Sequence, residues 1–287
     1  MSGWRGRLRA ASAGLLGAAL VTGWSLGSWA ATPGAAPLPL AFPLHLTSDQ
    51  VTVDNTGTTL IASGHVQVDY GADHATANTL RLTKAARTAE LSGHVTVTGP
   101  QGQATAETVT LTLTPTNEVT RAVMTGSASV ETPQYALSAD TIDADRSTQR
   151  LVGEGHVTAF NAPDLIINGD RVVYDQRTEH GLVTGHPTVA NKAGRMQGSA
   201  IDLFRAEDRA VIHGPVQADV YGAAITSADA TVNFKTSVAT LTGHVVMVRR
   251  QGTLWADRVT IFYETRRMIA EGTTRAHFTE LGDTENP

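Results

Sequence analysis

A glycine recurs about every 29 residues along most of this 287-residue chain. The spacings are 29, 33, 29, 30, 29, 29 and 29 residues between Gly64, Gly93, Gly126, Gly155, Gly185, Gly214, Gly243 and Gly272. Four of these glycines open the same tripeptide, Gly-His-Val. A fixed period of this length is typical of arrays in which neighbouring repeats bury one another's apolar faces. The period therefore constrains the fold more than any single motif does.

A second motif returns halfway between successive glycines. It consists of a small residue, a polar residue, any residue and an aliphatic residue, as in Ala77–Leu80, Ala139–Ile142 and Ala256–Val259. Each repeat accordingly holds two strands, one that begins near the glycine and one that begins near the second motif. Eight half-repeats of each kind predict about sixteen strands.

Apolar and polar residues alternate within each half-repeat. Leu60, Val66 and Val68 share one parity, whereas His65 and Gln67 share the other. This period of two is that of a half-buried strand, and turn signals separate the strands about every 14 residues. One apolar face per strand, in a chain with only 5% aromatic residues, predicts an all-β protein in which two sheets, or one folded sheet, close on an aliphatic interior.

The first 45 residues differ from the rest of the chain. Three arginines precede an uncharged stretch that ends in small residues, which predicts a secretory signal peptide over residues 1–30, cleaved after Ala30. The alternative is an uncleaved membrane anchor. Four prolines make residues 31–45 an extended linker. We therefore expect a mature protein in the periplasm, where having no cysteine avoids unwanted disulfides.

Two sets of polar residues are candidates for chemistry. They are the histidines His65, His94, His156, His186 and His244, and the aspartates Asp49, Asp140, Asp170, Asp229 and Asp257. The histidines share the polar parity, so we expect them to face solvent rather than to converge as metal ligands. The aspartates lie where we expect strands to begin, which favours bonding to nearby backbone N–H groups. No catalytic motif, metal site or cofactor is predicted, and we expect no enzyme. A net charge of -5 excludes a basic nucleic-acid footprint.

The aliphatic interior itself is the remaining candidate site. Its residues are consistent both with an ordinary core and with a groove in which small side chains leave lengthwise space for acyl chains. The inward-facing residues of the predicted groove are Val51, Val53, Leu60, Val66, Val68, Leu80, Leu82, Leu91, Val95, Val97, Val109, Leu111, Ile142, Val157, Val172, Ile201, Val216, Leu241, Val245, Val259 and Ile261.

The repeated Gly-His-Val strand and the Ala-Asp-x-Val return strand, behind a signal peptide and without cysteine, resemble the OstA-like (LptA) family of periplasmic lipopolysaccharide-transport proteins over about residues 46–279. The resemblance implies a twisted, V-shaped β-jellyroll, open along one side, that holds the acyl chains of lipopolysaccharide or a related glycolipid. It also implies a bridge between inner-membrane LptC-like and outer-membrane LptD-like jellyroll partners. The length leaves open one long jellyroll or two fused units, about 46–160 and 161–279, before a polar tail, 280–287.

An open jellyroll ends in two unpaired edges, and unpaired edges recruit further strands. The predicted end-to-end assembly residues are Leu46, Val51, Val53, Thr274, Ala276 and Phe278, which would also allow head-to-tail self-assembly. Two alternative functions remain open, an LptC-like membrane-anchored relay component and a non-catalytic extracellular structural or sugar-binding β-solenoid. Against a sugar-binding solenoid, Trp255 is the only tryptophan outside the predicted signal peptide.

Overall fold

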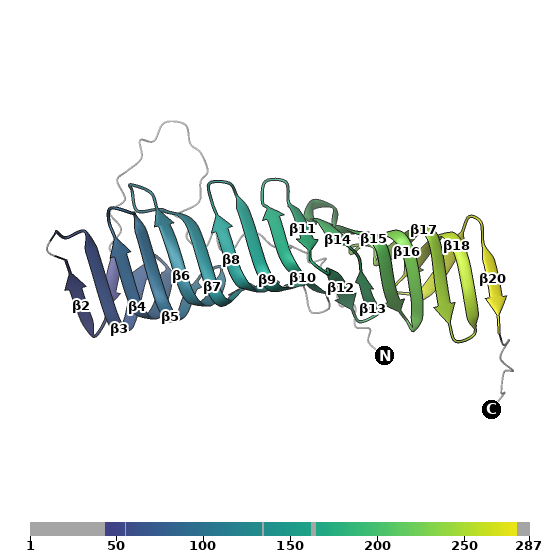
Figure 1. Ribbon diagram of the computed structural model, residues 1–287, viewed down its shortest axis with the longest axis horizontal. Helices are drawn as coiled ribbons and strands as arrows, with labels where there is room; N and C mark the ends of the chain where they lie inside the picture. The colour runs from purple at the N-terminus through teal and green to yellow at the C-terminus, as the bar shows by residue number, and fades with distance from the viewer. Residues whose placement is uncertain (1–43, 55, 134, 162–164, 280–287) are drawn as a thin grey trace, which may run out of the picture.

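The computed structural model describes residues 44–54, 56–133, 135–161 and 165–279, which contain 20 β-strands and one short 3-10 helix (Figure 1). The predicted signal peptide and polar tail, and nearly all of the predicted linker, lie outside the described residues. Within the described ranges, no helix is long and apolar enough to cross a membrane.

The strands follow one another in chain order along the long axis of the molecule (Figure 1). Their bounds are β1 Leu44–Thr47, β2 Gln50–Val53, β3 Thr59–Tyr70, β4 Asp73–Thr83, β5 Thr88–Gly99, β6 Gly102–Leu113, β7 Val119–Glu131, β8 Tyr135–Asp145, β9 Arg150–Asn161, β10 Leu165–Asp175, β11 His180–Thr184, β12 Thr188–Asn191, β13 Gly194–Gln197, β14 Ala200–Phe204, β15 Arg209–Val220, β16 Ala223–Asn233, β17 Val238–Arg249, β18 Gly252–Phe262, β19 Arg267–Glu271 and β20 Arg275–Phe278. The 3-10 helix η1 is Arg205–Glu207.

Four strand positions are interrupted midway, so that each is counted as two short strands. Both β1 and β2 pair with β3, and both β19 and β20 pair with β18. In the same way β11 and β12 share the neighbour β10, while β13 and β14 share β15. The 20 strands therefore occupy sixteen positions, and each pairs antiparallel with the next along the chain. The predicted all-β jellyroll of about sixteen antiparallel strands is confirmed.

The repeat glycine and the residue after it form a β-bulge in the middle of a strand. In β9, Gly155 and His156 have φ values of 76° and 47°, and the register to β8 shifts at this point. A Cβ on Gly155 would lie 2.1 Å from Oδ2 of Asp140, so both the left-handed backbone and the close approach require glycine. A bulge bends its strand, which divides each long strand into two halves.

The placement of strand starts at the glycine and at the aspartate was wrong. Asp140, Asp170, Asp229 and Asp257 lie inside β8, β10, β16 and β18, and Asp49 lies in the interruption between β1 and β2. The physical reason is that the inward parity changes within the strands that carry the aspartate motif, as between Ala139 and Ile142 in β8, so one continuous strand looks like the end of one element and the start of another. The aspartates face the bulge of the neighbouring strand instead of a turn.

The two halves of the strands form two walls around one apolar interior. In β3, Ala62 before the bulge and Val66 after it are 0% and 1% exposed, and both belong to one continuous hydrophobic cluster. The walls join along the row of bulges, and turns line the two free margins of the walls. The first rim comprises the turns 56–58, 84–87, 114–118, 146–149, 176–179, 205–208, 234–237 and 263–266, and the second rim comprises the turns 71–72, 100–101, 132–133, 192–193, 221–222 and 250–251.

Candidate functional site

The interior between the walls contains most of the predicted groove residues. Of the 21 residues, fifteen are buried, Leu60, Val68, Leu82 and Val97 are partly buried, and Val51 and Val53 are exposed. The two exposed valines pair with Leu60 and Ala62 of β3, so they occupy the inward parity at the open end of the stack. The set therefore lies on the inward parity of the strands, and lipid binding by these residues stays a prediction.

A cavity of about 590 Å³ lies between the walls in the N-terminal half. Leu60, Leu82 and Leu111 line it from the first wall, and Val68 and Ala75 line it from the second. The four partly buried groove residues all belong to β3, β4 and β5, because side chains there do not fill the space between the walls. This volume lies within the range of about 300–1,000 Å³ typical of ligand sites.

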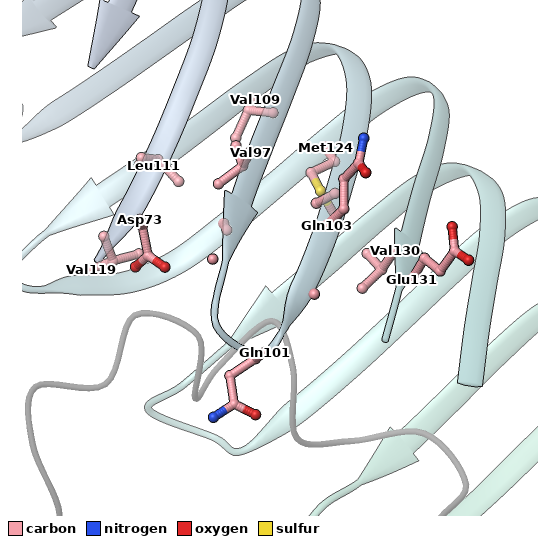
Figure 2. A pocket seen from close by; sticks show the side chains of 14 residues that line it. Asp73, Val97, Gln101, Gln103, Val109, Leu111, Val119, Met124, Val130 and Glu131 are labelled. Atoms are coloured by element: carbon pink, nitrogen blue, oxygen red, sulfur yellow. The ribbon is translucent and has the colours of Figure 1, made fainter. Parts of the chain in front are cut away.

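A smaller pocket of about 50 Å³ continues the same interior towards β7 (Figure 2). Val97, Val109 and Met124 line it with apolar groups, while Asp73 and Glu131 add carboxylates. Burial raises the pKa of Asp73 to about 6, because a charged carboxylate loses hydration next to apolar side chains. Asp73 therefore changes its charge closer to neutral pH than an ordinary aspartate does.

The interior is closed more tightly in the C-terminal half. Ile201, Ile212, Val216, Leu241 and Ile261 are each 0% exposed. Close packing of this kind leaves little room for a guest molecule. The same alternating pattern thus gives an open interior at one end and an ordinary packed core further along.

A hydrogen bond joins the two rims in this closed half. The hydroxyl of Tyr221, in the second rim, donates to the carbonyl oxygen of Tyr263, in the first rim, at 2.8 Å. The guanidinium of Arg266 lies 5.7 Å from the centre of the Tyr221 ring. Burial raises the pKa of Tyr263. These contacts bridge the open side of the jellyroll, a feature that sequence reasoning missed because the two tyrosines are 42 residues apart.

A further cavity of about 380 Å³ lies beyond this bridge, at the C-terminal end of the stack. Met247, Leu254 and Met268 line it together with Phe278 of β20. Phe278 is 65% exposed, so this cavity opens at the end of the molecule.

Three of the five motif histidines meet a motif aspartate along the row of bulges: His65 meets Asp49, His156 meets Asp140 and His186 meets Asp170. Nδ1 of His156 lies 2.9 Å from Oδ2 of Asp140, and Nδ1 of His65 lies 2.8 Å from Oδ2 of Asp49. The carboxylate of Asp140 raises the pKa of His156. The side chain of His156 is 91% exposed, which confirms the predicted solvent-facing position. Among the described residues, no group of three histidines or acids is placed to hold a metal ion.

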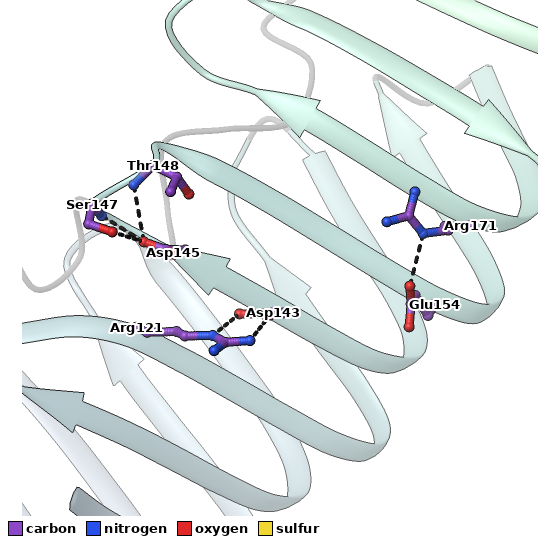
Figure 3. Close-up of polar contacts among 7 residues, drawn as sticks. All are labelled: Arg121, Asp143, Asp145, Ser147, Thr148, Glu154 and Arg171. Carbon is purple, nitrogen blue, oxygen red and sulfur yellow. Dashed lines mark hydrogen bonds and ion pairs between the residues drawn. The ribbon is translucent and has the colours of Figure 1, made fainter.

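Aspartates elsewhere on the outer face also have structural partners (Figure 3). Nε of Arg121 donates to Oδ1 of Asp143 at 2.9 Å. Oδ1 of Asp145 accepts from the backbone N–H groups of Ser147 and Thr148 at 2.8 and 3.1 Å. These carboxylates therefore hold a strand pair and a turn of the first rim in place.

The predicted assembly residues lie at the two ends of the stack. Leu46 belongs to β1, Val51 and Val53 to β2, Ala276 and Phe278 to β20, and Thr274 to the bend between β19 and β20. Within the described ranges, β1 and β2 pair only with β3, while β19 and β20 pair only with β18. Their outer edges therefore present unpaired backbone groups, and assembly through them stays a prediction.

The described residues thus form an antiparallel β-jellyroll with an apolar interior between two rims of turns. The family model described as "LptA/(LptD N-terminal domain) LPS transport protein" matches residues 45–150 and 224–286, more than half of the chain. The chain belongs to this family, whose members are transport proteins. Residues 151–223 lie between the matched segments and continue the same antiparallel pairing from β9 to β15.

Among solved structures, the chain is similar to LptH from Pseudomonas aeruginosa, described as the LptA homologous periplasmic component of the conserved lipopolysaccharide transport device. The identity is 16%, the match covers 50% of this chain and 82% of that chain, and the TM-score is 0.28. No curated protein matches the chain.

Proposed function

We propose that this protein is a periplasmic bridge that carries lipopolysaccharide, or a related outer-membrane glycolipid, from the inner to the outer membrane. The acyl chains lie in the apolar interior, and the polar part of the lipid stays in water at the rims. The observation that carries the proposal is the cavity of about 590 Å³ between the two walls. An ordinary core would be filled to crystal-like density, whereas this interior keeps space where its aliphatic residues are partly buried.

Lipid loading of matched variants tests the proposal. Val68 lines the cavity, whereas its neighbour Gln67 is exposed on the opposite face of β3. Val68→Glu should abolish retention of acylated lipid, because a carboxylate among apolar side chains loses hydration and occupies the space of an acyl chain. Gln67→Glu places the same charge outside and should leave loading unchanged. Mass spectrometry of lipids that copurify with each variant measures the effect, after circular dichroism has shown equal β-sheet content. Equal loading of the two variants would contradict the proposal.

The ends of the stack would join the protein to LptC-like and LptD-like jellyrolls, or to further copies of itself. Strand addition uses the free backbone groups of an edge strand and extends both the sheet and its interior into the partner. A head-to-tail contact of this kind need not close into a ring and can form an open bridge. Photocrosslinkers at Thr52 in β2 and Ala276 in β20 should capture opposite ends of neighbouring jellyrolls. One at Thr96, in the middle of β5, should capture none. Capture between identical ends would instead indicate a two-fold dimer.

The location is part of the same proposal. A basic, apolar and then small-residue order over residues 1–30 supports export and cleavage after Ala30. N-terminal sequencing of the protein from a periplasmic fraction should therefore begin at Ala31. Recovery of intact residues 1–30 on membrane-bound protein would favour an LptC-like anchored component.

A further inference from the structure

The two larger cavities share a charge pattern that differs from that of the chain as a whole. The chain has 27 acidic and 22 basic residues. The N-terminal cavity is nevertheless lined by Lys84 and Arg87 and by no carboxylate. The C-terminal cavity is lined by Arg249 and Arg266, again without a carboxylate. Each cavity thus combines an apolar interior with two cations.

Among the described residues, no acidic side chain forms an ion pair with any of these four cations. Other arginines do have such partners, as Arg121 does with Asp143. Their positions at the rims follow from the turns. Lys84 and Arg87 are the first and last residues of one first-rim turn, which the Arg87 N–H closes by donating to the Lys84 carbonyl at 3.2 Å.

The second pair of cations comes from both rims. Arg249 ends β17 beside the second rim, and Arg266 belongs to the first rim. The guanidinium of Arg249 lies 3.3 Å from the sulfur of Met268, and that of Arg266 lies over the Tyr221 ring. Both arginines are exposed, and their charged groups border these side chains.

We propose that each cavity binds the phosphate of an acylated lipid, with the acyl chain in the apolar interior and the phosphate between the two cations at the rim. This inference rests on the proposed function and adds the headgroup chemistry. A phosphate monoester carries a charge of about -1.5 to -2 near neutral pH, which two cations match. Arginine also offers paired N–H donors to phosphate oxygens.

Two detergents with the same chain separate headgroup recognition from chain binding. Isothermal titration calorimetry of the full-length mature protein with monododecyl phosphate should show two sites that bind at least about tenfold tighter than n-dodecyl maltoside does. The preference should shrink between 50 and 500 mM NaCl, because salt screens exposed charges. Binding of neither detergent would overturn the proposed function itself. Equal binding of both would overturn only the phosphate site.

Charge-removing variants locate the sites. The double variant Lys84→Gln with Arg87→Gln should reduce the number of tight monododecyl phosphate sites from two to one, and Arg249→Gln with Arg266→Gln should remove the other. Arg81→Gln is the matched control, because Arg81 is exposed on the outer face of β4, which leads into the turn of Lys84 and Arg87, and does not line the cavity. Dodecyl maltoside binding should be unchanged in all of these variants. An unchanged number of phosphate sites in folded variants would overturn the proposal.

A competition experiment identifies the source of the phosphate. Lipopolysaccharide that displaces monododecyl phosphate, and loses this ability after enzymatic removal of its phosphates, would identify a phosphorylated glycolipid. Stronger displacement by dimyristoyl phosphatidic acid would identify a phospholipid. Displacement by neither lipid would overturn the assignment of these cavities to lipid phosphate.

Discussion

Replacing Asp73 with asparagine should stabilise the protein at neutral pH. Asp73 begins β4 and lines the small pocket beside the N-terminal cavity, where burial raises its pKa to about 6. A rise from the ordinary aspartate value near 3.9 corresponds to about 3 kcal/mol of unfavourable free energy for the ionised group. Because the side chain is partly exposed, solvent screening reduces this upper bound to about 1 kcal/mol. Asp73→Asn should therefore raise Tm by about 2–4 °C at pH 7.5.

The sign of this effect depends on pH. The folded protein holds the proton of Asp73 more tightly than the unfolded chain does, so the penalty is absent below the unfolded pKa and complete above about 6. The gain from Asp73→Asn should accordingly be present at pH 7.5 and largely lost at pH 4. Glu90→Gln, which removes an exposed carboxylate from the neighbouring strand β5, serves as the control. Urea unfolding at both pH values measures the gain, and an equal gain at both would refute the reasoning from burial.

Three further changes test the framework of the fold. Tyr221→Phe should cost about 1 kcal/mol in urea unfolding, because the Tyr263 carbonyl loses its donor across the rims; an unchanged midpoint would mean that the rims separate in solution. Gly155→Ala should cost about 1–3 kcal/mol more than Gly71→Ala, since both have positive φ but only Gly155 has no room for a Cβ. His156→Asn should lower Tm at pH 5.5 but not at pH 8.5. Because the pKa of His156 is raised in the folded protein, its contribution to stability is complete below pH 6.5, the ordinary pKa of histidine. The contribution is lost as the pH rises through the folded pKa.

The architecture could be predicted from the sequence because it depends on local patterns of residues. The alternation around Val66 and Val68 depends only on the geometry of an extended chain, and the glycine period counts the strands. The structure has both features. The strands occupy sixteen positions, and the aliphatic residues of the strands face the interior. The solvent exposure of His65 could also be predicted from its parity. In the structure His65 lies in the bulge with Gly64, and its side chain faces solvent.

The site could be predicted only in part, because its features depend on contacts between distant segments. Asp140 was misplaced at a strand start because a single sequence does not reveal that the bulge of the next strand packs against it. Lys84 and Arg87 look like ordinary turn residues until the two walls bring their turn to the mouth of a cavity. The bridge between Tyr221 and Tyr263 depends on how far the walls open, which alternation does not determine.

The uneven packing of the interior leads to a last expectation. Unfilled space costs stability because lining atoms lack packing partners, so the open strands β3–β7 should be held less firmly than the closed strands β14–β16. A lipid that fills the cavity of about 590 Å³ should restore those contacts where the space is. At a hundredfold excess over Kd, the lipid contributes about 2.7 kcal/mol, which corresponds to about a hundredfold slower amide exchange. Hydrogen exchange with and without lipopolysaccharide should therefore show protection in β3–β7 and, at the C-terminal cavity, in β17 and β18, but not in β14–β16. Equal protection in β14–β16 would show that the lipid lies along the whole interior, and that the closed part opens to admit it.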